Sequence, residues 1–189
     1  VQWMTAGSGI VHQEMPKGDE HGAMHGFQLW ANLPAKNKMT APRYQEIKAH
    51  QIPEIEVDGA RIKVVAGECE GVRGPVSDIF TEPEYLDITL TAQGRFQRRI
   101  PADHTVLLYA IGGSGTTAST EVSNRELVLY GSGEEISVDA GPEGLRFLLL
   151  SGKPLGEPIA WRGPIVMNTE QELDTAFREY QEGTFIKQA

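Results

Sequence analysis

The chain has 189 residues, with 26 acidic side chains, 17 basic side chains and a formal net charge of -9. This charge, with no Lys or Arg cluster along any segment, argues against direct binding to nucleic acid or to an anionic membrane surface. The sequence contains neither a secretory signal nor an apolar run long enough to span a bilayer. The single cysteine, Cys69, cannot form an internal disulfide. We therefore expect a cytoplasmic protein.

The first residues, Val1-Gln2-Trp3-Met4, have the character of a strand interior, without an initiator Met or a polar leader. We expect the chain to be a fragment. Gly and Pro number 21 and 11 and are spread between short apolar runs, a pattern typical of many short strands. The predicted class is all-β, and strand order alone leaves a sandwich and a barrel both open. The strand candidates are residues 1–4, 9–15, 27–33, 45–50, 61–66, 86–91, 96–100, 105–111, 126–130, 135–140 and 146–151.

The sequence also predicts turns, a domain boundary and one helix. Residues 92–94 and 131–133 are predicted to be hairpin turns between apolar runs. Residues 67–75 are rich in Gly and charge, so we place a boundary between two β units near them, with domains at 1–70 and 71–189. Near the end, Thr169 and Glu172 form a capping-box pattern before an amphipathic run, which predicts a C-terminal helix.

His12 and Glu14 are the centre of the functional hypothesis. They are two residues apart in a predicted strand, so both side chains would project from the same face into one cavity. An imidazole and a carboxylate together suit Fe(II), Mn(II) or another first-row divalent ion. The alternative is a structural pair in which the two side chains bind each other or solvent.

Several segments resemble one family. Residues 1–14, followed by Gly26-Phe27-Gln28-Leu29-Trp30-Ala31-Asn32-Leu33-Pro34, are similar to the second metal-motif region of the pirin family. Residues 65–68, 71–75, 151–158, 161–164 and 166–169 resemble later pirin segments in the same order. The resemblance covers essentially the whole chain.

The resemblance implies a bicupin, in which two antiparallel β-barrels face each other and the N-terminal barrel holds iron through three His and one Glu. His12 and Glu14 match the last two of these ligands, and the first two belong to a His-x-His motif that this sequence does not contain. The first barrel would then be incomplete and hold half a metal site. Either a separate segment supplies the rest, or the polypeptide binds little metal.

Other candidates surround this pair. Gln28 and Trp30 alternate with apolar residues, so they could line a substrate pocket or orient the ligands, although ordinary barrel packing explains the same pattern. His21 and His25 lie in a polar loop and are expected to be solvated. Cys69 has no cationic neighbour in sequence that would lower its pKa, so it is a poor nucleophile.

The family resemblance implies two functions. Some pirins have quercetin 2,3-dioxygenase activity, in which a divalent metal binds a flavonol and O2 is inserted; Glu14 would then also accept the flavonol proton. Other pirins are redox-responsive regulatory proteins that bind a protein partner. No residue selects between these functions, and a third possibility is an inactive proteolytic product. We expect the second barrel to be free of metal.

Overall fold

The computed structural model describes residues 1–15 and 17–187. The chain forms two compact units, one of residues 1–3 and 45–155 and the other of residues 4–44 and 156–189. A short two-stranded sheet pairs β1 with β2. These strands span Gln2–Thr5 and Arg43–Glu46. No helix in the described ranges is long and apolar enough to cross a membrane.

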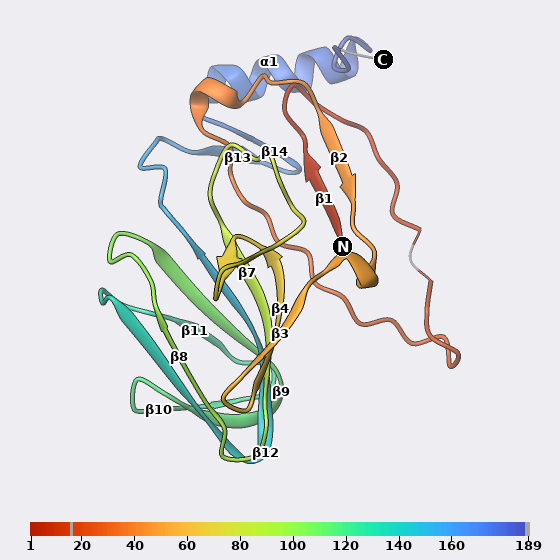
Figure 1. The fold of residues 1–189 in the computed structure, drawn as a ribbon. Helices are drawn as coiled ribbons and strands as arrows, with labels where there is room; N and C mark the ends of the chain where they lie inside the picture. The colour runs from red at the N-terminus through yellow and green to blue at the C-terminus, as the bar shows by residue number, and fades with distance from the viewer. Residues whose placement is uncertain (16, 188–189) are drawn as a thin grey trace. The chain divides into compact units, whose positions relative to one another are not determined.

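The first unit is built on one eight-stranded antiparallel sheet, in the order β10-β9-β12-β7-β4-β3, with β11 paired to β9 and β8 paired to β12 (Figure 1). A small hairpin, β5–β6, and a single turn of 3-10 helix, η2, complete it. The elements are η2 Ala49–Gln51, β3 Glu54–Val57, β4 Ala60–Ala66, β5 Glu68–Cys69, β6 Val72–Arg73, β7 Glu84–Leu90, β8 Arg95–Arg99, β9 Thr105–Thr117, β10 Thr120–Ser123, β11 Leu127–Leu129 and β12 Glu135–Gly152.

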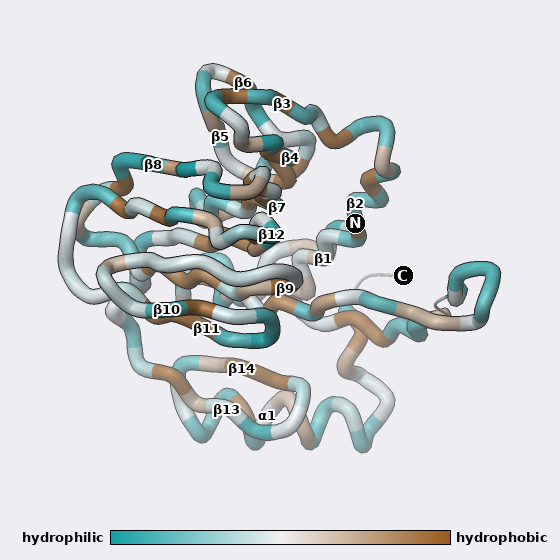
Figure 2. Tube along the Cα trace, turned by 90° about the horizontal axis from the view of Figure 1, so that it is seen from below, coloured by the Kyte–Doolittle hydropathy of each residue, from teal (hydrophilic) through white to brown (hydrophobic). Residues whose placement is uncertain are grey.

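Strand β12 closes this sheet around a core. Its first half pairs with β8, its second half pairs with β7, and β9 runs along both halves. Alternation places Leu86, Ile88 and Leu90 of β7 in the interior, where at most 2% of each is exposed. Burying each such side chain contributes about 1.5–3 kcal/mol. Figure 2 shows mostly hydrophilic residues along β8, where Phe96 is the one apolar residue of the strand and is buried. The predicted all-β cupin-type architecture is confirmed.

The predicted turns need correction. Residues 92–94 turn the chain, but the strands on either side, β7 and β8, both pair with β12 and not with each other. Residues 131–133 likewise join β11 and β12, which both pair with β9. A turn sequence makes the chain change direction, but packing of the core decides which strands pair with each other. A hairpin that the sequence analysis missed joins β3 to β4 at Asp58-Gly59, where both residues have positive φ angles, 45° and 79°.

The second unit contains little sheet. Its elements are η1 Ala35–Asn37, β13 Ala160–Arg162, β14 Ile165–Met167 and α1 Glu170–Gln181. Strands β13 and β14 form an antiparallel hairpin. Helix α1 begins after Thr169, and Thr169 and Glu172 form the predicted capping box. Leu173 and Ala176 form its buried face, and Arg162 lies over the ring of Phe177 at 5.5 Å.

Two predicted strands, residues 9–15 and 27–33, are wrong. The described residues between Thr5 and Arg43 contain no strand. A strand needs a neighbouring strand for its backbone hydrogen bonds, and no described segment pairs with either stretch. The apolar residues that suggested strands are instead exposed, including Val11 at 69% and Leu29 at 45%. The predicted boundary between domains 1–70 and 71–189 stays a prediction.

Candidate functional site

His12 and Glu14 lie next to each other in an extended segment of the second unit. His12 Nδ1 and Glu14 Oε1 are 3.5 Å apart, and 42% and 54% of the two side chains are exposed. Two residues in extended backbone place their side chains on the same side even without a strand. The predicted apposition is present, whereas the predicted strand around it is absent. The two side chains are exposed, and the predicted cavity does not enclose them.

This pair can contribute to a metal site without completing one. Two donor atoms 3.5 Å apart can both lie about 2.1 Å from one ion, the usual length of a bond from zinc to nitrogen or oxygen. In the described ranges, however, no group of three or more His, Cys, Asp or Glu side chains could hold a metal ion. Two ligands leave most coordination positions to solvent. The described residues thus fit half of a divalent metal site.

A short turn leads into the pair. The backbone N–H of Ser8 donates to the carbonyl oxygen of Thr40 at 2.8 Å, and the N–H of Gly9 donates to Ala6 at 3.0 Å. Gly7 and Gly9 have φ angles of +52° and +122°, which side chains rarely allow. These contacts fix the point from which the chain runs to His12.

The other histidines of the second unit are solvated. His21 lies 3.6 Å from Glu20, with more than 80% of both side chains exposed. The carboxylate of Asp19 accepts the backbone N–H of His21 at 2.9 Å and shapes the turn. His25 makes an edge contact with Phe27 at 5.0 Å. As the sequence indicated, these are loop residues.

Gln28 and Trp30 are exposed, and no hydrogen bond or ring contact joins them to His12 or Glu14 in the part of the chain that the structure describes. The indole of Trp30 instead lies 6.3 Å from that of Trp161 on β13. The indole N–H of Trp161 donates to Gly163 at 2.8 Å. A pocket role for Gln28 and Trp30 stays a prediction.

Sequence reasoning missed Lys38, which is only 6% exposed. Its ammonium donates to Asn32 Oδ1 and, at 3.0 Å, to the carbonyl oxygen of Leu33. Burial lowers the pKa of Lys38, and the carboxylates of Glu157 and Glu172 oppose that shift. Lys38 thus anchors the end of the segment that carries Trp30. No spacing rule in the sequence would have identified it.

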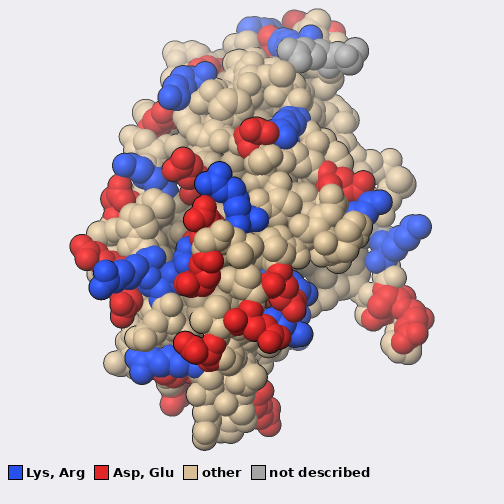
Figure 3. Space-filling view, in the orientation of Figure 1, with Lys and Arg blue, Asp and Glu red and all other residues tan. Residues whose placement is uncertain are grey.

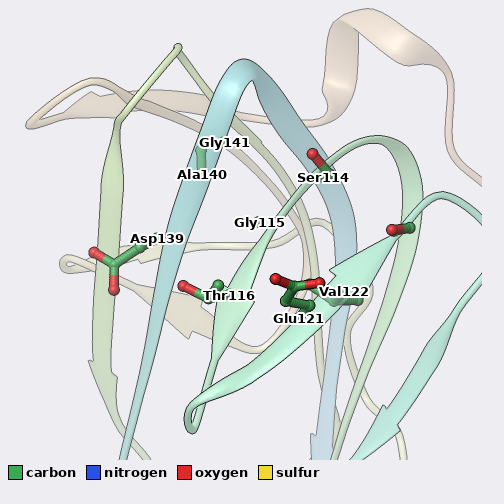
Figure 4. A pocket seen from close by; sticks show the side chains of 9 residues that line it. Ser114, Gly115, Thr116, Glu121, Val122, Asp139, Ala140 and Gly141 are labelled. Atoms are coloured by element: carbon green, nitrogen blue, oxygen red, sulfur yellow. The ribbon is translucent and has the colours of Figure 1, made fainter.

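A shallow hollow on the first unit offers a second candidate. Its volume is about 350 Å³, and it lies where β9, β10 and β12 meet (Figure 4). Thr116, Glu121 and Asp139 face it from three neighbouring strands. Neither His nor Cys lines it, and Asp139 is paired with Arg95 at 3.5 Å. Two carboxylates separated by a threonine do not make a metal site.

The surface carries acidic and basic groups close together. On the face shown in Figure 3 they are interspersed, without a block of one sign. Lys153 and Asp103, for example, are paired at 2.9 Å, with 73% and 58% of their side chains exposed. Exposed pairs of this kind contribute little to stability. They do not point to a charged ligand.

Cys69 has a cationic neighbour that its sequence does not reveal. Arg98 Nη1 lies 3.4 Å from Cys69 Sγ, and Arg98 also pairs with Glu84. Burial raises the pKa of the Cys69 thiol, and Arg98 opposes this with a smaller effect. Cys69 is 1% exposed, so we expect burial to make its thiol a poor nucleophile.

Comparison with known families then defines the chain. Residues 85–186 match the family model described as the Pirin C-terminal cupin domain, and residues 1–31 match the model described as Pirin. The chain belongs to the pirin family. His12 and Glu14 fall within residues 1–31, the segment that matches the Pirin model.

Individual relatives agree with this pirin assignment. Pirin-1 of Arabidopsis thaliana is 41% identical over 187 residues, which cover 96% of this chain and 64% of that protein. A pirin-like protein of Caulobacter vibrioides is 42% identical, with coverages of 98% and 67%. A crystal structure of quercetin 2,3-dioxygenase from Acinetobacter baumannii matches with a TM-score of 0.82 and 33% identity, covering 97% of this chain and 66% of that one. The chain therefore spans about two thirds of these relatives.

Proposed function

We propose that this pirin-family protein takes part in a quercetin 2,3-dioxygenase-type reaction on a flavonol. In this proposal His12 and Glu14 are two ligands of a divalent first-row metal, with Fe(II) the first choice, and a further segment supplies the remaining ligands. The observation that carries the proposal is the 3.5 Å approach of His12 Nδ1 to Glu14 Oε1. The 33% identity to quercetin 2,3-dioxygenase from Acinetobacter baumannii supports the choice of reaction.

The chain's own residues have distinct roles in this scheme. The imidazole of His12 offers a nitrogen donor, and the carboxylate of Glu14 offers an oxygen donor beside it. A carboxylate has two oxygens, so Glu14 can also accept the proton of a flavonol hydroxyl as a general base. When bound, a divalent metal acts as a Lewis acid toward a substrate oxygen. Gln28 and Trp30 are proposed to line the substrate pocket.

The free Cys69 thiol fits a reducing compartment, and we place the protein in the cytoplasm. We propose no direct contact with nucleic acid or membrane, because the net charge of -9 opposes attraction to phosphate groups.

Turnover in air tests the proposal. The chain is joined to the upstream segment expected to carry the His-x-His ligands, loaded with Fe(II), and mixed with quercetin while the flavonol absorbance is followed. We expect absorbance to fall, and we expect His12→Ala to abolish both the loss of absorbance and most of the bound iron. His21→Ala is the matched control, because His21 also lies beside a carboxylate, at 3.6 Å, but in the solvated loop.

Two results would contradict the enzymatic proposal. A His12→Ala protein that binds iron and consumes quercetin like the unsubstituted protein would remove His12 from the site. A fully loaded protein that leaves quercetin unchanged would instead support the alternative, a non-enzymatic, iron-dependent and redox-responsive regulator that binds a protein partner.

A further inference from the structure

The turn at Gly9 lies directly under an aromatic ring from the C-terminal end of the chain. A Cβ atom placed on Gly9 would be 2.6 Å from Cε1 and 2.7 Å from Cζ of Phe185. Real side-chain atoms do not approach so closely, so the ring occupies the space that any side chain at position 9 would need. Both residues belong to the second unit.

Phe185 is held in this place by the end of helix α1. Gly183, with a φ angle of +73°, ends the helix. The backbone N–H of Thr184 donates to the carbonyl oxygen of Glu179 at 2.8 Å, and the ring of Phe185 stands edge-on to Tyr180 at 5.9 Å. The backbone hydrogen bond places Phe185 beside the end of the helix, and the edge contact with Tyr180 favours one orientation of its ring.

The opposite side of the turn is closed as well. A Cβ atom on Gly7 would be 2.2 Å from the carbonyl oxygen of Thr40. The hydroxyl of Ser8 is buried and has no partner among the residues that the structure describes. The turn at residues 7–9 is thus enclosed between Thr40 and Phe185, and the chain emerges from it three residues before His12.

We infer that Phe185 is a positioning residue for the His12–Glu14 pair. The ring closes the turn from which the ligand segment starts, so it limits the directions in which that segment can leave. That the pair binds a metal rests on the proposed function. The path of residues 10–14 is independent of that proposal, because it depends only on packing within the metal-free chain.

Phe185→Ala, Phe185→Tyr and the control Phe177→Ala test this inference on the full chain. Phe177 lies on helix α1, which leads to Phe185, but contacts Arg162. The order of residues 10–14 is measured by ¹⁵N relaxation without metal, and the His12 ring signals are then followed while zinc sulfate is added. We expect Phe185→Ala to increase the motion of residues 10–14 and to weaken zinc binding by about tenfold, within the range for residues that orient metal ligands. Phe185→Tyr should keep the original behaviour, and so should Phe177→Ala.

Gly9→Ala approaches the same contact from the other side, and we expect it also to increase motion in residues 10–14. Unchanged relaxation in both Phe185→Ala and Gly9→Ala would overturn the inference, and so would an equal loss of order in Phe177→Ala. If the unsubstituted chain shows no zinc-dependent change at His12, the pair does not bind metal without the further segment, and the relaxation data alone decide the role of Phe185.

Discussion

Arg98 on β8 and Glu84 on β7 form a partly buried ion pair between strands that do not pair with each other. Arg98 Nε lies 2.9 Å from Glu84 Oε1 and 3.0 Å from Oε2. Nη2 of Arg98 also donates to the carbonyl oxygen of Glu68 at 2.6 Å. The side chains are 17% and 14% exposed. One guanidinium thus links β7, β8 and the β5–β6 hairpin.

Glu84→Ala should destabilise the first unit, because it leaves the partly buried Arg98 charge without its partner. We expect a cost of about 1.5–3 kcal/mol, the range for hydrogen bonds to charged groups, which is less than breaking a fully buried pair costs. Glu54→Ala is the matched control, since Glu54 pairs with Lys63 at 3.8 Å on the surface and should cost no more than about 1 kcal/mol. Urea unfolding monitored by circular dichroism gives both values. Equal losses would contradict the structural role of the partly buried pair.

Cys69 should titrate above its ordinary pKa of 9.0, because burial disfavours the thiolate. At neutral pH the native protein should therefore react with iodoacetamide only on unfolding. A raised folded-state pKa gives stability that is complete below the unfolded value and is lost as pH rises through the folded value. Cys69→Ala should reduce this alkaline loss, as measured by urea midpoints between pH 7 and pH 10. Fast alkylation of the native protein would exclude a buried thiol.

Helix α1 should weaken in acid. Its Glu172 carboxylate accepts the N–H groups of Thr169 at 2.8 Å and Asn168 at 3.0 Å. Hydrogen bonding to Thr169, as the largest influence, lowers the pKa of Glu172 below its usual 4.5. The contribution of this carboxylate is therefore present above that value and is lost as pH falls. Amide exchange in residues 170–181 should be faster at pH 3 than at pH 6, after correction for intrinsic rates.

Glu172→Gln should remove most of this pH dependence, and Thr169→Ala should cost about 1 kcal/mol of helix stability at neutral pH. Glu170→Gln is the control, because Glu170 pairs with Arg162 at 2.8 Å and does not cap the helix. A pH response that survives Glu172→Gln unchanged would contradict the capping argument.

The sequence predicted the parts of the fold that depend on local patterns. Leu86, Ile88 and Leu90 alternate and form a core strand, and Thr169 with Glu172 marks the true start of the helix. The two strands expected at 9–15 and 27–33 have the same local character but are absent. The alternation of apolar and polar residues predicts which face of a strand would be buried. It does not show whether a neighbouring strand is present to accept the backbone hydrogen bonds.

The candidate site shows the same division. The i, i+2 spacing of His12 and Glu14 was enough to predict that their side chains meet, because this depends on extended backbone alone. Gly9 and Phe185 are in contact although they are 176 positions apart, and neither local sequence predicts this contact. Long-range packing of this kind, like the proximity of Arg98 to Cys69, follows only from the folded chain.

Gly113 should tolerate substitution far less well than Gly71, although both have left-handed backbone, with φ angles of +74° and +76°. A Cβ atom at Gly71 would meet nothing within 4 Å, whereas one at Gly113 would lie 2.1 Å from the carbonyl oxygen of Gly144. Gly71→Ala should cost about 1 kcal/mol from backbone strain. Gly113→Ala should cost about 1–3 kcal/mol more through overpacking where β9 meets β12. Similar thermal midpoints for the two variants would contradict this difference.

Glu14→Gln should weaken the binding of divalent ions to the chain, while Glu20→Gln should leave it unchanged. Both carboxylates lie beside an imidazole, at 3.5 Å from His12 and 3.6 Å from His21, so simple proximity to histidine is the same in both. Glu14 is two residues from its histidine, whereas Glu20 and His21 are adjacent in a turn. An amide oxygen replaces a carboxylate poorly as a ligand for first-row ions. Titration calorimetry with manganese or nickel chloride should show a loss of at least about tenfold for Glu14→Gln. Equal affinity in both variants would mean that the ions bind through general surface charge and not through the His12–Glu14 pair.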